Sequence, residues 1–88
     1  MSYFISLDAI KREQAFQIVK KSLQIAEDYA LKSTNVRYDG KYALAKKYYN
    51  VSKHNLIRAY KLTMHYDFYV INKITAALTD MNIKINEL

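Results

Sequence analysis

The middle third of the chain concentrates basic side chains that could bind an anionic partner. Residues 32–61 hold eight lysines and arginines against one acid, Asp39, so this segment has a net charge of +7 while the whole chain has +6. The eight are Lys32, Arg37, Lys41, Lys46, Lys47, Lys53, Arg58 and Lys61. Clustered cations of this kind neutralise phosphates or acidic protein surfaces, and a solvated basic face is the structural alternative.

Tyrosines lie between these cations, and they are Tyr38, Tyr42, Tyr48, Tyr49 and Tyr60. Aromatic rings beside cations can stack on nucleobases, and tyrosines can equally pack at a helix end with the hydroxyl in water. Because Tyr48 and Tyr49 are neighbours, they point about 100° apart on a helix, and we expect one of them to take each role.

Catalytic and metal-binding patterns are weak in this sequence. Glu27 and Asp28 diverge by about 100° around a helix, so they make a poor acid–base pair. His65 and Asp67 are two residues apart and do not share a helix face, as a metal pair spaced i, i+4 would. The sequence has no glycine-rich phosphate loop and no nucleophile elbow. We therefore expect no enzymatic activity, no metal and no other cofactor.

Length and composition indicate one helical domain spanning residues 1–88. A chain of this size buries only about 60–65% of its unfolded surface, so oligomerisation is an obvious source of further stability. The absence of cysteine excludes disulfides and fits a reducing cytoplasm, and the absence of proline with a single glycine favours unbroken helices. We see no signal peptide and no apolar run approaching the roughly 18 residues of a membrane span, so we expect a cytoplasmic protein without a membrane partner.

The elements that would position the basic residues are three helices. Apolar residues at spacings of three and four predict a long amphipathic helix over residues 7–32, capped by Ser6 or Asp8. Residues 33–40 are the expected loop, in which Asp39-Gly40 is a turn dipeptide. Residues 3–7 could form a short strand or only the lead-in to the first helix.

A short helix is expected over residues 41–49 and a long one over 52–80, with Asn50 ending the first and Ser52 capping the second. The long helix carries an apolar heptad seam, which could pack inside the chain or join two copies as a homodimer. Its members are Ile57, Tyr60, Met64, Ile71, Ile74, Leu78 and Met81. Residues 82–86 alternate with period two and could form a strand or a frayed tail.

Residues 50–58, Asn-Val-Ser-Lys-His-Asn-Leu-Ile-Arg, resemble the turn and recognition helix of helix-turn-helix DNA-binding proteins. The resemblance spans residues 41–61, with Lys46 and Ile57 departing from the family's usual residue types. It implies that Val51 plugs the turn and that Leu56 and Ala59 point inward. It also implies that four residues point at the major groove of DNA, namely Lys53, His54, Asn55 and Arg58.

The resulting hypothesis is an all-α, three-helix domain with a long first helix, a short second helix and a long third helix, able to dimerise through the third. Its expected function is that of a small basic DNA-binding protein, a transcriptional or replication regulator of the phage or plasmid type. The expected interface is Lys41, Lys46, Lys47, Lys53, His54, Asn55, Arg58 and Lys61 on double-stranded DNA. The alternatives are a helical interaction module whose basic face binds an acidic protein, as an inhibitor or assembly adaptor, and a small RNA-binding protein.

Overall fold

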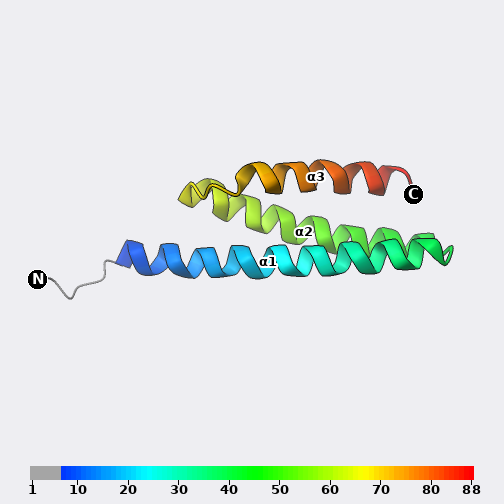
Figure 1. Ribbon diagram of the computed structural model, residues 1–88, viewed down its shortest axis with the longest axis horizontal. Coiled ribbons are helices and arrows are strands. Elements are labelled where there is room, and N and C mark those ends of the chain that lie inside the picture. The colour runs from blue at the N-terminus through cyan, green and yellow to red at the C-terminus, as the bar shows by residue number, and fades with distance from the viewer. Residues whose placement is uncertain (1–6) are drawn as a thin grey trace, which may run out of the picture.

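Three antiparallel helices make up the structure, a computed structural model that describes residues 7–88 (Figure 1). They are α1 (Leu7–Tyr38), α2 (Tyr42–Tyr66) and α3 (Ile71–Asn86). The expected all-α, three-helix architecture is thus confirmed. The molecule is elongated, with principal extents of 61, 17 and 13 Å. None of these helices is both long and apolar enough to cross a membrane.

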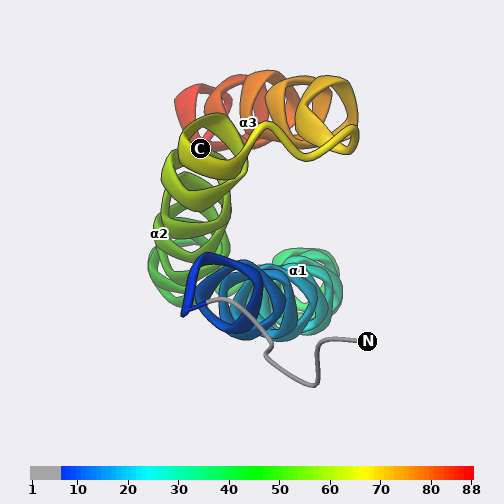
Figure 2. The same cartoon turned by 90° about the vertical axis from the view of Figure 1, so that its left-hand side faces the viewer.

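Helix α2 is the central element of the fold. It packs against α1 on one side and α3 on the other, whereas α1 and α3 make no close backbone contact with each other. Seen along the long axis, the three helices form an open C with α2 as its spine (Figure 2). Neither neighbouring helix lies on the convex side of that spine (Figure 2).

Small residues recur at heptad spacing in the interface between α1 and α2. In α2 the buried positions alternate at intervals of four and three, and they are Ala45, Tyr49, Ser52, Leu56, Ala59 and Thr63. In α1 they are Ala15, Val19, Ser22, Ala26 and Ser33. Small side chains let two helix backbones approach closely, and here two hydroxyls bridge them: Ser33 donates to the carbonyl of Ala45 and Ser52 donates to that of Ala26.

Two hydrophobic clusters attach α3 to this pair of helices. The first lies where α2 turns into α3 and contains Phe68 and Ile74, with Phe16 meeting Phe68 edge to face at 5.2 Å between ring centroids. The second lies nearer the α1–α2 turn, where Met81 packs with Tyr49 and other core residues. Both clusters draw on all three helices, which fixes the direction of α3.

Both turns use a residue with positive φ. Gly40 has φ 78°. The backbone N–H of Gly40 donates to the carbonyl of Arg37, and the N–H of Lys41 donates to that of Val36. Asp67 has φ 54°. The backbone N–H of Asp67 donates to the carbonyl of Met64, and the N–H of Phe68 donates to that of Thr63. This is the Schellman pattern, in which a left-handed residue satisfies the last carbonyls of a helix. The turn expected at Asp39-Gly40 is confirmed.

Several expected element boundaries are wrong. α1 runs on to Tyr38 instead of ending at 32, because Ser33 is buried against α2 and does not belong to a loop. No break occurs at residues 50–52, which lie inside α2. The expected helix 52–80 is instead broken at Asp67, so the second helix is longer than the third.

The termini also differ from expectation. Residues 82–86 are the end of α3 and not a strand. Of the strand considered at 3–7, only Leu7 lies within the described residues, and it begins α1.

The heptad seam expected on the third helix is divided between two helices. Ile74 and Met81 are buried inside the chain, whereas Met64 is 56% exposed at the end of α2. These residues therefore do not form one continuous surface for a second copy.

Candidate nucleic-acid interface

The solvent-facing side of α2 carries a row of basic side chains. Its members are Lys47, His54, Arg58, Lys61 and His65, all exposed, and below they are called the α2 basic row. Successive members are seven, four, three and four residues apart, the spacing at which side chains line up on one helix face. The two ends of the row are 18 residues apart, or about 27 Å along the helix axis. Around the helix axis it lies opposite the buried positions of α2.

No carboxylate competes for this row within α2. The helix contains five lysines and arginines, two histidines and no aspartate or glutamate. Among residues 7–88 the ion pairs are Arg37–Glu87 and Lys84–Asp80, which involve α1, α3 and the residue that follows α3, but not α2. The cations of the row are therefore free to neutralise an external anion.

The structure brings together only part of the expected interface. Lys47, His54, Arg58 and Lys61 share the basic row, as a DNA-binding surface requires. Lys46 and Lys53 lie about 100° away around α2, on the flank that faces α3. Lys41 stands at the N-cap of α2, beyond the end of the row.

Asn55 does not point freely into solvent. Its side-chain amide donates a 2.9 Å hydrogen bond to the carbonyl of Val51, one turn earlier in the same helix, and the residue is half-buried. An amide held in this way is not presented to a base edge.

The turn that the helix-turn-helix resemblance requires is not present. Ser52 is 1% exposed and bonds to α1, so it does not cap a new helix, and Val51 is a half-buried helical residue. Leu56 and Ala59 do point inward, as the resemblance implied, with 4% and 0% exposure. Residues 50–58 thus form the middle of one long helix.

His65 belongs to the basic row and was not among the expected site residues. Its position four residues after Lys61 and seven after Arg58 was the signal in the sequence. This signal was missed because a helix was expected to run on to residue 80. Its faces were assigned from the apolar seam through Ile57 and Met64 and not from the basic residues.

An aromatic contact between α1 and α2 adds one lysine of α1 beside the α2 basic row. The rings of Tyr29 and Tyr48 meet edge to face at 5.7 Å, and the ammonium of Lys32 lies 4.8 Å from the centre of the Tyr29 ring. Exposed Lys21 lies three helical turns before Lys32, but Asp28 occupies the same side of α1. α1 therefore adds less positive charge than α2 does.

No known protein family, curated protein or solved structure matches the chain. The interface is therefore inferred from its geometry and its charge.

Proposed function

We propose that this chain is a small DNA-binding protein that binds the phosphate backbone of double-stranded DNA through the α2 basic row. The observation that carries the proposal is the row itself: three exposed cations and two histidines along about 27 Å of helix without a carboxylate in α2. Each phosphate contact releases condensed counterions from DNA, and this supplies affinity that is largely independent of sequence.

Arg58 is the residue of the row best suited to read a base. Its guanidinium can donate two hydrogen bonds to guanine O6 and N7, whereas the amide of Asn55 is engaged within its own helix. Sequence preference would then rest on few residues, and most of the binding energy would come from phosphate contacts. We further propose that the protein is a cytoplasmic regulator of transcription or replication that acts by occupying DNA. A homodimer would double the number of its phosphate contacts.

The experiment is a titration onto a random duplex, followed by fluorescence anisotropy at several salt concentrations. The wild-type chain should bind with a slope of log affinity against log salt of about −3 or steeper, which corresponds to several phosphate contacts. Lys47→Glu combined with Lys61→Glu should reduce affinity more than roughly tenfold and flatten the slope.

The matched control is Lys20→Glu combined with Lys73→Glu. These two lysines are also exposed but lie on α1 and α3, away from the basic row, and the change in net charge is identical. The control pair should keep most of the affinity. Equal losses in both pairs would show a general charge effect and overturn the assignment to α2. Absence of duplex binding at low salt would overturn the function itself and favour an acidic protein or RNA as the partner.

A further inference from the structure

A cleft opens at the end of the molecule where α1 turns into α2 and α3 ends. It has a volume of about 730 Å³, within the range of roughly 300–1,000 Å³ typical of ligand sites. All three helices line it, and the residues that matter below are Arg37, Tyr38, Tyr42, Tyr49, Lys84 and Glu87. It lies beyond the N-terminal end of the α2 basic row and is not part of it.

Two tyrosines of this cleft are held at the surface. Tyr38 is 87% exposed and Tyr42 is 58% exposed, so neither ring contributes much to the core. Tyr49 also lines the cleft but is buried, and its hydroxyl and that of Thr34 are 3.1 Å apart. The two exposed rings can receive a flat aromatic ligand, because every nucleobase offers a face for stacking.

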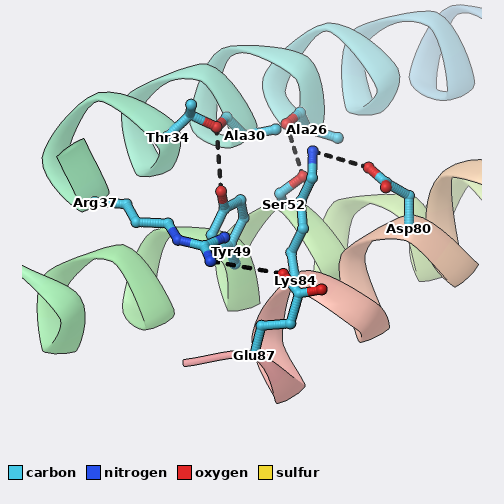
Figure 3. A network of polar contacts seen from close by, with 9 residues as sticks. All are labelled: Ala26, Ala30, Thr34, Arg37, Tyr49, Ser52, Asp80, Lys84 and Glu87. Carbon is cyan, nitrogen blue, oxygen red and sulfur yellow. Dashed lines mark hydrogen bonds and ion pairs between the residues drawn. The ribbon is translucent and has the colours of Figure 1, made fainter.

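The cations of the cleft are paired with carboxylates that are themselves partly exposed. A guanidinium nitrogen of Arg37 lies 3.6 Å from the Glu87 carboxylate, longer than a good charge-assisted hydrogen bond, and both side chains are partly exposed (Figure 3). Lys84 is 3.0 Å from Asp80, one turn earlier on α3. Exposed pairs of this kind are weak, so a phosphate can replace the carboxylates as the partner of either cation.

We propose that this cleft binds an unpaired nucleotide, with its base stacked on Tyr38 and Tyr42 and its phosphate beside Arg37 and Lys84. Exposed Lys46 follows Tyr42 by one helical turn on the same side of α2 and provides a further phosphate contact between the cleft and the basic row. The inference extends the proposed function, since a duplex bound along α2 would present a frayed or single-stranded end to the cleft. A free mononucleotide has the same chemistry.

The test compares a blunt duplex with the same duplex bearing a short single-stranded overhang, by anisotropy under identical salt. The wild-type chain should bind the overhang duplex about tenfold more tightly, because stacking of bases on aromatic side chains has that order of effect. Tyr38→Ala combined with Tyr42→Ala should remove this gain and leave blunt-duplex affinity unchanged. The control is Tyr69→Ala, which removes an equally exposed ring, 86% exposed, at the opposite end of the molecule.

A second measurement identifies the source of the nucleotide and separates this inference from the proposed function. Deoxyadenosine monophosphate is titrated while the ring protons of the tyrosines are followed by NMR. Chemical-shift changes confined to the cleft tyrosines would support the site. They would also show that a free nucleotide is enough for binding, even if no duplex binds. An overhang gain without such shifts also supports it and assigns the ligand to a DNA strand. The proposal is overturned if neither the gain nor the shifts are seen, or if Tyr69→Ala removes as much of the gain as the cleft variant.

Discussion

The hydroxyl of Ser52 donates a 2.7 Å hydrogen bond to the backbone carbonyl of Ala26, from the middle of one helix to the middle of another. Both residues are almost fully buried, at 1% and 3% exposure. Figure 3 shows this bond joining the two helices. Such a contact requires the α1 and α2 backbones to lie close together, and it requires helix α2 to continue unbroken through residues 50–52.

The continuity of α2 can be tested at Ser52 itself. Inside a helix, glycine is about 1 kcal/mol less favourable than alanine, whereas at an N-cap glycine is the better of the two. We therefore expect Ser52→Gly to be less stable than Ser52→Ala by about 1 kcal/mol. Urea unfolding followed by circular dichroism measures the difference. The reverse order would place a helix start at Ser52 and contradict the structure.

The close approach of α1 and α2 predicts intolerance to larger side chains. Ala59 is 0% exposed in this interface, so Ala59→Leu should force the helices apart and cost about 1–3 kcal/mol. Ala76 is exposed on α3, and Ala76→Leu should change stability by less than about 0.5 kcal/mol. Thermal or urea unfolding of both variants makes the comparison. Equal free energies of unfolding for the two variants would show that the α1–α2 interface can accommodate a larger side chain and is not closely packed at Ala59.

The two turns should respond to substitution with opposite signs. Gly40 has φ 78°, and no other group lies within 4 Å of the place that a Cβ atom would take, so Gly40→Ala adds only backbone strain, costing about 1 kcal/mol. Asp67 already bears a side chain at φ 54°, and Asp67→Gly should keep or raise stability, by up to about 1 kcal/mol. Denaturant unfolding gives both values. A stability loss in Asp67→Gly would mean that its carboxylate has a stabilising role that the turn geometry does not explain.

Substitutions at Asn55 and at Arg58 should have different effects on DNA affinity. Asn55→Ala removes an amide already bonded to Val51 and should change affinity less than about twofold, whereas Arg58→Ala should weaken binding roughly tenfold and relax any sequence preference. Competition between duplexes of different sequence provides the measurement. A large effect of Asn55→Ala on sequence preference would show that Asn55 contacts DNA after all.

The helical class and the Gly40 turn could be predicted because they rest on local chemistry. The false break at residues 50–52 came from giving Asn50 and Ser52 their usual roles at helix ends. Small and hydroxyl residues also serve where two helices pack closely, and here Ala45, Ser52 and Ala59 recur every seven residues for that reason. The break at Asp67 was missed because the apolar heptad seam favoured one continuous helix, although aspartate can adopt the left-handed conformation that ends a helix.

The candidate site could be predicted in its charge but only partly in its geometry. The absence of acids between residues 42 and 66 is visible in the sequence. Which cations share a face depends on the phase of the helix, and a boundary placed at residue 52 separated Lys47 from Arg58 and Lys61. The same boundary presented Asn55 as a base-reading residue, although its partner Val51 lies in the same helix.

The order of contacts has a consequence for how the chain folds. Close backbone contacts join each helix only to the helix that precedes or follows it, so most of them connect segments that are near in sequence, while α1 and α3 meet only through side chains. Chains dominated by local contacts have a low contact order and fold in microseconds to milliseconds. We expect folding to begin in the α1–α2 hairpin, with α3 docking last, and backbone amides of α3 should exchange with solvent sooner than those of α2, which is packed on two sides.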